Sequence, residues 1–467
     1  MKKVLLVNTN TEKFPYPAPP LGLCLLASVI EQTYDTKIYD GLFVEGDNLS
    51  GLLTEFQPDF AGIGIRNIDD MVMDKINFYV DTIYREFILP IKQYSNAIPV
   101  LGGSGFSIFP YELMKKFGIN TGIIGEAEGS LPILLKNLEE RKEIASIPGV
   151  VVADDRKKGS NFRNGYDMKD LPFAKIDNHI RYAPYMNSAY PVQTKRGCSR
   201  SCIYCTYPRI EGKQYRFRKV SDIVDEIEQT CQRLGRLTFE FVDSTFNDPP
   251  GWAEEICRQI IKRKIKATFR TMGINPAHGS RELFALMVEA GFSQIDCTPD
   301  SASPQMLSNL GKNFSLEQLE KCTRFLRDVD LPTMWFFTFG GPGETEETIR
   351  QTFDFIQKRI NRNDMIHMTT GLRIYPNTRL HQIALEEKLV KAQDPLLEPC
   401  FYISEELGKE RIDSILAEEA LSLPNCIPAA ESTPSPEMLS EAYRIRAAEN
   451  LNEPMFRTLI RIRNSGI

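Results

Sequence analysis

Three cysteines stand close together in the stretch KRGCSRSCIYCTYP, which covers residues 195–208. They are Cys198, Cys202 and Cys205, and Tyr204 directly precedes the third. A structural zinc ion takes four tetrahedral ligands, yet none of the four histidines of the chain forms a tight sequence pair with another cysteine. Three thiolates suit a four-iron cluster in which one iron keeps an open coordination position. The spacing therefore favours an iron–sulfur cluster over zinc.

The other seven of the ten cysteines are scattered singly, and we interpret each as a small buried hydrophobic residue. The 467 residues are 42% hydrophobic and 25% charged, which is typical of a globular protein with two or three domains. The N-terminal apolar run is too short for a signal peptide, and no apolar stretch approaches the roughly 20 residues of a membrane span. We expect a cytoplasmic protein without a membrane partner, whose thiols stay reduced.

The net charge of −6 argues against a nucleic-acid partner. The stretch around the cysteines is an exception, because residues 195–219 carry eight lysines and arginines against a single acid, Glu211. Positive charge beside thiols lowers their pKa and balances an anionic cofactor. We expect these cations to serve the cluster, and an ordinary solvated face is the alternative.

Strand and helix patterns alternate in the first 150 residues. KVLLVN, DFAGIGI, IPVLGG and TGIIG have the pattern of buried parallel strands, and LGLCLLASVIEQ and MDKINFYVDTIYREFI that of helices. This alternation predicts an α/β, Rossmann-like doubly wound domain over residues 1–150. There is no GxGxxG fingerprint, so a dinucleotide is not the favoured ligand. Residues 151–188 are polar and are expected to form a connector.

The same alternation resumes after the connector, with candidate strands PVQTKR, LTFEFVD, KATFRTM, QIDCTPD, TMWFFTFGG and HMTTGLRIY. Six β/α units predict a partial (β/α)6 barrel of the TIM type over residues 189–392, with its site at the C-terminal ends of the strands. The cysteines follow the first strand and should lie at that mouth. Residues 393–467 hold two helical patterns around a Pro/Ser-rich break, and we expect a small helical cap that shapes the substrate pocket.

The spacing Cys198-x3-Cys202-x2-Cys205, with the aromatic Tyr204, resembles the CxxxCxΦC signature of the radical S-adenosylmethionine (radical SAM) superfamily. The resemblance implies a [4Fe-4S] cluster whose open iron binds the amino and carboxylate groups of S-adenosylmethionine. It also implies an external reductant such as flavodoxin or ferredoxin, whose electron cleaves the sulfonium to give a 5′-deoxyadenosyl radical. Tyr204 takes the position that contacts adenine in the family.

Three further stretches resemble motifs of the same superfamily. FEFVDSTFN places Asp243 where the family contacts the methionine amino group, although the usual GGE triplet is absent. PDSAS places Asp300 and Ser301 at the ribose, with a polar strand-end turn as the alternative. FGGPGET resembles the GxPGET stretch, in which Gly340 and Gly341 would let the backbone approach the adenosine.

Residues 1–150 resemble the cobalamin-binding domain that precedes many radical SAM methyltransferases, in the pieces PPLGLCLLASVIE, PDFAGIGI, LGGSGFSIFP and IGEAEGSLPILL. The resemblance implies that the corrin packs against the C-terminal edge of the strands. Gly102, Gly103 and Ser104 would admit its nucleotide tail.

The loop after the third N-terminal strand, at Arg66 and Asn67, would then face the lower side of the cobalt. The DxHxxG motif that supplies a cobalt-ligating histidine elsewhere is missing, and no histidine precedes His179. A protonated guanidinium cannot coordinate a metal, so Arg66 would block this face. A surface salt bridge to Asp69 or Asp70 is the alternative for Arg66.

Together the resemblances imply a monomeric, cobalamin-dependent radical SAM methyltransferase that acts on an unactivated carbon of a small-molecule or natural-product substrate. One S-adenosylmethionine would methylate the cobalamin and a second would yield the radical that abstracts hydrogen. The first alternative is a non-methylating rearrangement or cyclisation on the same architecture, or an enzyme that has lost cobalamin. The second is a non-catalytic iron–sulfur protein for electron transfer or sensing.

Overall fold

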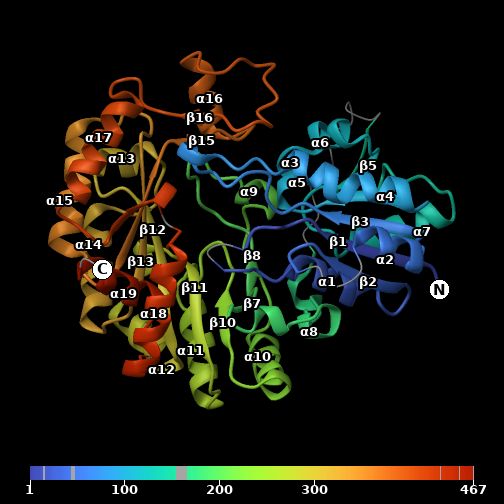
Figure 1. The fold of residues 1–467 in the computed structure, drawn as a ribbon, viewed down its shortest axis with the longest axis horizontal. Helices are drawn as coiled ribbons and strands as arrows, with labels where there is room; N and C mark the ends of the chain where they lie inside the picture. The colour runs from blue at the N-terminus through green and yellow to red at the C-terminus, as the bar shows by residue number, and fades with distance from the viewer. Residues whose placement is uncertain (14–15, 44–47, 154–165, 432, 452, 466–467) are drawn as a thin grey trace.

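Two α/β units follow one another along the chain and lie side by side, the first coloured blue to cyan and the second green to red (Figure 1). The computed structural model describes the chain except for residues 14–15, 44–47, 154–165, 432, 452 and 466–467. No helix in these described ranges is both long and apolar enough to cross a bilayer.

The N-terminal unit is built on a six-stranded sheet with the order β2-β1-β3-β4-β5-β6. The four predicted buried strands are confirmed as β1, β3, β4 and β5, and the pairs among β1 to β5 are parallel, whereas β6 is antiparallel to β5. The strands are β1 (Lys3–Asn8), β2 (Asp35–Asp40), β3 (Phe60–Gly64), β4 (Ile98–Gly102), β5 (Thr121–Ile123) and β6 (Val150–Val152).

Helices cover this sheet. The segment between β3 and β4 differs most from the predicted secondary structure. The predicted helix over residues 73–88 has only a short turn at η1 and becomes continuous from Val80, because residues 66–79 form a loop closed by a bridge between Asp69 and Phe78. The helices are α1 (Leu21–Ile30), α2 (Leu49–Phe56), η1 (Met73–Lys75), α3 (Val80–Ile83), η2 (Tyr84–Ile88), α4 (Leu89–Tyr94), α5 (Ser104–Ile108), α6 (Pro110–Phe117) and α7 (Ser130–Glu139).

The second unit is an all-parallel, seven-stranded sheet with the order β17-β14-β13-β12-β11-β10-β7. The six predicted strands are confirmed as β7 and β10 to β14. The prediction of a purely helical C-terminal segment is wrong, since β17 comes from that segment and adds a seventh strand to the sheet. The strands are β7 (Tyr190–Val192), β10 (Thr238–Phe241), β11 (Thr268–Ile274), β12 (Phe292–Asp300), β13 (Thr333–Phe339), β14 (Met365–Thr370) and β17 (Cys426–Pro428).

Two small hairpins stand above the strand ends of this sheet. One pairs β8 (Lys195–Arg196) with β9 (Arg216–Phe217) and encloses the cysteine motif. The other pairs β15 (Leu372–Arg373) with β16 (Phe401–Tyr402). The cysteines therefore leave the sheet at its carboxyl edge.

Several helices of the second unit begin at side-chain caps that compensate free backbone N–H groups. The predicted capping box of Ser315 and Gln318 is present, and Thr345 accepts a hydrogen bond from the N–H of Thr348. The helices are α8 (Ile176–His179), α9 (Tyr207–Ile210), α10 (Val220–Leu234), α11 (Trp252–Lys262), α12 (Arg281–Ala290), α13 (Pro304–Asn309), α14 (Leu316–Asp328), α15 (Glu346–Arg359), α16 (Arg379–Glu386), α17 (Gly408–Ala420), α18 (Pro436–Glu449) and α19 (Met455–Asn464). The remaining short turns are η3 (Met168–Asp170), η4 (Ala183–Tyr185), η5 (Pro276–His278) and η6 (Ala429–Glu431).

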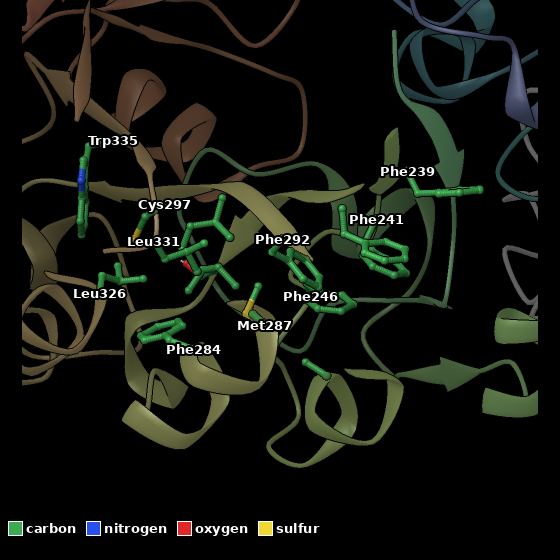
Figure 2. Close-up of a cluster of buried hydrophobic side chains, with 14 of the residues drawn as sticks. Phe239, Phe241, Phe246, Phe284, Met287, Phe292, Cys297, Leu326, Leu331 and Trp335 are labelled. Atoms are coloured by element: carbon green, nitrogen blue, oxygen red, sulfur yellow. Dashed lines mark hydrogen bonds between the residues drawn. The ribbon is translucent and has the colours of Figure 1, made fainter. Parts of the chain in front are cut away.

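The main core lies between this sheet and the helices that cover its outer face, and Figure 2 shows part of it. Phe241 lies at the centre of a group of stacked rings, with its ring centroid 4.5 Å from that of Phe246. Alternate strand residues enter this core, so the residues between them face the opposite side of the sheet. We call the seven-stranded sheet the barrel sheet and this opposite side its inner face. Of the seven single cysteines, five are buried, and Cys231 and Cys400 are half-buried.

Candidate active site at the strand ends

The three motif cysteines are free thiols on one loop above β8 and β9, with Cys198 buried and the other two half-buried. The loop is fixed by its backbone: Cys198 N–H donates to Gly212 O (3.0 Å). The bend that starts it requires glycine, because Gly197 has φ +95° and a Cβ there would stand 2.1 Å from the carbonyl oxygen of Gln214. The three cysteine sulfurs thus lie on one loop that begins at a rigid bend.

This donor set fits a cluster better than a single ion. Within the described residues, no group of three or more His, Cys, Asp or Glu side chains is placed to hold one metal ion. A [4Fe-4S] cluster makes a different demand, because each thiolate binds its own iron atom. The residues present therefore fit a cluster held by Cys198, Cys202 and Cys205.

The predicted role of the basic stretch around the cysteines is wrong for five of its eight cations. Each of the five pairs with a buried acid on another element and so helps hold the loop in place. The pairs are Lys195–Asp243 (3.1 Å), Arg196–Glu128 (2.5 Å), Arg200–Asp248 (2.7 Å), Arg216–Glu126 (2.7 Å) and Arg218–Glu226 (2.7 Å).

The cation beside the thiols is instead Lys312, which the sequence analysis did not single out. Its ammonium is buried and donates to Asp300 (2.8 Å) and to the carbonyl of Thr298 (2.9 Å). Burial raises the pKa of the Cys205 thiol to about 12 and that of Cys202 in the same direction, whereas the charge of Lys312 lowers both. Lys312 therefore favours the thiolate forms that iron requires.

Tyr204 and Asp300, predicted to contact the adenine and the ribose, meet at the same place. The Tyr204 hydroxyl donates a hydrogen bond to the Asp300 carboxylate, and Lys312 Nζ lies 3.4 Å from the Tyr204 hydroxyl. Asp300 has φ +64°, an uncommon conformation for a residue other than glycine, at the end of β12. The structure thus brings these two predicted residues together around Lys312.

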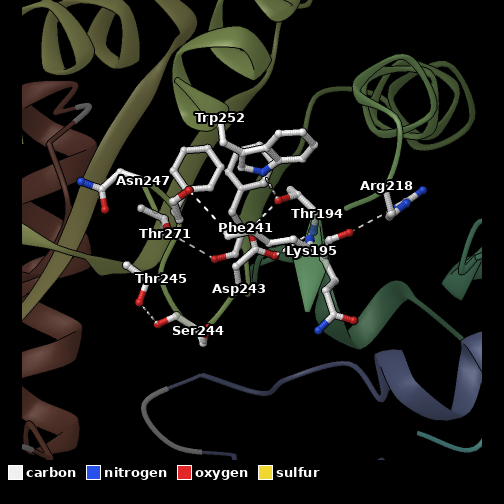
Figure 3. Close-up of polar contacts among 12 residues, drawn as sticks. Thr194, Lys195, Arg218, Phe241, Asp243, Ser244, Thr245, Asn247, Trp252 and Thr271 are labelled. Atoms are coloured by element: carbon white, nitrogen blue, oxygen red, sulfur yellow. Dashed lines mark hydrogen bonds and ion pairs between the residues drawn. The ribbon is translucent and has the colours of Figure 1, made fainter. Parts of the chain in front are cut away.

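Asp243 occupies a different environment from the one expected for a contact with the methionine amino group. Its buried carboxylate accepts hydrogen bonds from the N–H of Thr194 (2.7 Å) and of Lys195 (3.2 Å), from the Thr194 hydroxyl and from Lys195 Nζ (Figure 3). Trp252 Nε1 donates to the same Thr194 hydroxyl (2.9 Å). Four donors fill the acceptor capacity of one carboxylate, so Asp243 positions the start of the cluster loop.

Ser301, Gly340 and Gly341 are all buried at the carboxyl edge. The Ser301 hydroxyl lies 3.1 Å from the Thr352 hydroxyl on α15, so it faces the helix layer. Gly340 has φ +92°, and its N–H donates to Glu344 (3.2 Å). Burial raises the pKa of Glu344 to about 7.

At the edge of the N-terminal sheet, Arg66, Asn67, Gly103 and Ser104 are exposed and Gly102 is half-buried. Gly103 has φ +99°, and a Cβ there would lie 2.4 Å from the carbonyl of Ile65, so the turn requires glycine. The Ser104 hydroxyl donates to the Arg66 carbonyl (2.9 Å). The ends of β3 and β4 at this edge are therefore shaped by backbone.

The alternative prediction for Arg66, a surface salt bridge to Asp69 or Asp70, is wrong, because both acids have other partners. Asp69 pairs with the buried guanidinium of Arg373 (3.1 Å), and Asp70 accepts from Asn77 (2.7 Å). The charge of Arg66 reaches Tyr207 in the cluster loop, where it opposes the burial that raises the pKa of Tyr207 to about 12.

The loop IGEAEG after β5 joins the N-terminal edge to the cluster loop. Arg196 donates to Glu128, and Arg216 donates to Glu126 through both terminal nitrogens. Burial alone would raise the pKa of Glu128, but the Arg196 guanidinium holds it below its usual value. A Cβ at Gly125 would lie 3.3 Å from the carbonyl of Ile210 in α9, so the two loops are in close contact.

Comparison with known proteins gives concordant results. The family model of the radical SAM superfamily matches residues 192–356. An uncharacterized methyltransferase of Pyrococcus horikoshii is 24% identical over 435 residues, which are 87% of this chain and 90% of the relative. The tryptophan 2-C-methyltransferase of Streptomyces laurentii is also 24% identical, over 82% of this chain and 74% of the relative.

Among solved structures, the radical SAM methyltransferase TsrM of Kitasatospora setae shares the fold over all of both chains, with a TM-score of 0.82 and 22% identity. That structure holds cobalamin and a [4Fe-4S] cluster, and a second structure of the same enzyme holds tryptophan and an analogue of S-adenosylmethionine. The arrangement of two α/β units in this chain is therefore one that a solved enzyme also has.

Proposed function

Because this chain belongs to the radical SAM superfamily, in its cobalamin-dependent methyltransferase branch, we propose that it methylates an unactivated carbon of a small molecule. The observation that carries the proposal is the contact between the two strand edges. Glu126 and Glu128 fix the N-terminal edge against the loop that bears the three cysteines. A cofactor on each edge would then face the same substrate.

In this proposal Cys198, Cys202 and Cys205 hold a [4Fe-4S] cluster, and S-adenosylmethionine binds beside it. Lys312 supplies a buried positive charge at that position, next to Tyr204 and Asp300. A carboxylate of the cofactor would be attracted to the ammonium of Lys312, and the Asp300 carboxylate is an acceptor for ribose hydroxyls. Gly340 and Gly341 would let the backbone approach the adenosine.

Cobalamin is assigned to the exposed edge of the N-terminal sheet, where Gly102, Gly103 and Ser104 would line the nucleotide tail. Arg66 and Asn67 would lie under the lower face of the corrin. Since a protonated guanidinium offers no lone pair to a metal, Arg66 would keep that face free of a protein ligand. The bound cofactors would supply a radical and a methyl group to one substrate, with electrons from a reductant such as flavodoxin or ferredoxin.

We propose that the substrate binds at the inner face of the barrel sheet. We also propose that the chain acts as a monomer. The C-terminal segment contributes to this face, because Phe456 and Ile460 of α19 pack against Met365 and Ile427. The small-molecule class is supported by tryptophan as the substrate bound in one relative.

The test uses anaerobic protein with reconstituted cluster, supplied cobalamin and S-adenosylmethionine whose methyl group is deuterated. A metabolite extract from the source organism serves as the substrate pool, and mass spectrometry follows labelled products and both coproducts. The proposal expects a labelled product with S-adenosylhomocysteine and 5′-deoxyadenosine, all absent with Cys202→Ala. Formation of 5′-deoxyadenosine and a changed but unlabelled product would show a rearrangement or cyclisation instead.

A further inference from the structure

Three charged side chains lie on the inner face of the barrel sheet, on neighbouring strands. Strand alternation puts them there: Phe239 and Phe241, which flank Glu240, belong to the outer core, as do the two residues that flank Asp296. Arg270 on β11 is the strand neighbour of Glu240 on β10. The face therefore carries two acids and one base on three neighbouring strands, with Asp296 two residues beyond Gln294, the register partner of Arg270.

The single base is already committed to one of the acids. Arg270 Nε lies 2.7 Å from Glu240 Oε1, and the Tyr16 ring stacks on the guanidinium with 3.8 Å between the ring centroid and the guanidinium carbon. The Tyr16 hydroxyl also donates to Glu240 (2.9 Å). Glu240 and Arg270 thus form a neutral pair covered by Tyr16, and the buried Nη2 of Arg270 has no hydrogen-bond partner among the described residues.

Asp296 remains without a partner. Across the described ranges its carboxylate has neither a hydrogen bond nor an ion pair, and its Oδ1 is buried. Burial and the nearby charge of Glu240 raise the pKa of Asp296 to about 7, against the opposing effect of Arg270. Asp296 is half-buried as a residue, and a buried carboxylate oxygen without a donor is unfavourable by itself, so this position is open to a donor from outside the chain.

Other cations near this face do not complete it. Lys312 is bound to Asp300 and Thr298, and burial lowers the pKa of His367, so that its ring is neutral near pH 7. Apolar side chains adjoin Asp296 on the same face: Met334 is its register partner on β13, and Met272 of β11 is 45% exposed. The surroundings fit a hydrocarbon group that carries one positive charge.

We propose that Asp296 binds a protonated amine of the substrate, whose hydrocarbon part packs on Met272 and Met334. The inference rests on the proposed function, which places the substrate at this face. A protonated amine donates charge-assisted hydrogen bonds to the carboxylate and balances the acid that Arg270 leaves uncompensated. The substrate class is therefore a small primary or secondary amine with an apolar body.

The experiment measures binding of matched probes to cluster- and cobalamin-loaded protein by saturation-transfer NMR. The probes are tryptamine against tryptophol and phenethylamine against 2-phenylethanol, which differ in the amine alone. Wild type should prefer each amine by about tenfold or more, and Asp296→Asn should remove the preference. Asp328→Asn, on the outer helix α14, is the matched control and should retain it.

Equal binding of amine and alcohol by wild type, or no amine binding, would overturn the proposal without any variant. A preference that survives in Asp296→Asn would overturn it as well. Binding of S-adenosylmethionine is measured in parallel, and its loss in Asp296→Asn would reassign Asp296 to the cofactor. Because these assays need no turnover, an absence of methyl transfer would refute the proposed function and leave amine recognition standing.

Discussion

The barrel edge and the ends of β3 and β4 at the N-terminal edge are built in opposite ways. At the barrel edge, Asp243, Asp300 and Glu344 are buried acids whose oxygens are occupied by specific donors. At the ends of β3 and β4, Gly103 and Ser104 are exposed, and the shape comes from positive-φ backbone and close packing, whereas the buried acids Glu126 and Glu128 of this edge lie after β5. Charges fixed in a low-dielectric setting suit a small, highly charged cofactor, whereas a broad open edge suits a large flat one.

The largest effect is expected from a substitution that changes the barrel edge alone. Cys202→Ala removes one of the three thiolates, so the variant should hold little iron and cleave S-adenosylmethionine at the background rate. Iron content and anaerobic yield of 5′-deoxyadenosine measure this. Cys400→Ala, a half-buried thiol outside the motif, is the control and should keep both.

The next prediction concerns the ion pair that joins the two strand edges. Glu128→Gln leaves the buried Arg196 guanidinium without its full counter-charge, which should lower the free energy of unfolding by about 3 kcal/mol. Chemical denaturation at pH 7 checks it. Asp81→Asn, which breaks the exposed pair with Lys116, should cost under about 1 kcal/mol.

The pair of Glu128 and Arg196 also makes the stability of the protein depend on pH. The pKa of Glu128 is lowered in the folded protein, so its contribution is complete above the unfolded value, about 4.3, and is lost as pH falls through the folded one. The stability difference between wild type and Glu128→Gln should therefore begin to shrink as pH falls below about 4.3 and continue to shrink at lower pH. A difference that stays constant as pH falls well below that value would contradict the ion-pair explanation.

A third change tests whether fixed charge matters at the barrel edge. Lys312→Met removes the buried ammonium beside Asp300 and the thiols, so the affinity for S-adenosylmethionine should fall by about tenfold. Calorimetric titration of the cluster-loaded protein measures it. Lys312→Arg keeps the charge and should recover part of the affinity, whereas equal loss in both variants would indicate a steric effect.

The smallest expected effect concerns the N-terminal edge. Arg66 is exposed, so Arg66→Ala should change the unfolding free energy by less than about 0.5 kcal/mol. If Arg66 keeps the lower face of cobalamin free, the absorption spectrum of the bound cobalamin should change in the variant. Unchanged spectra and turnover would remove Arg66 from the mechanism.

Local patterns in the sequence predicted most strands and the cysteine loop, because alternation and spacing are short-range properties. They did not reveal the pairs Arg196–Glu128 and Arg216–Glu126, which join residues 68 and 90 positions apart. Lys312 was missed for the same reason, since its contact with Tyr204 spans 108 positions. β17 was missed because its three residues include a proline between two helical patterns.

The most direct test of the central claim is electron paramagnetic resonance of the reduced, iron-loaded protein before and after addition of S-adenosylmethionine. About four irons per chain and a cluster signal that shifts when S-adenosylmethionine is added are the predicted result, because the three thiolates leave one iron open to it. Bound zinc in place of iron, or a cluster signal that S-adenosylmethionine leaves unchanged, would contradict the account.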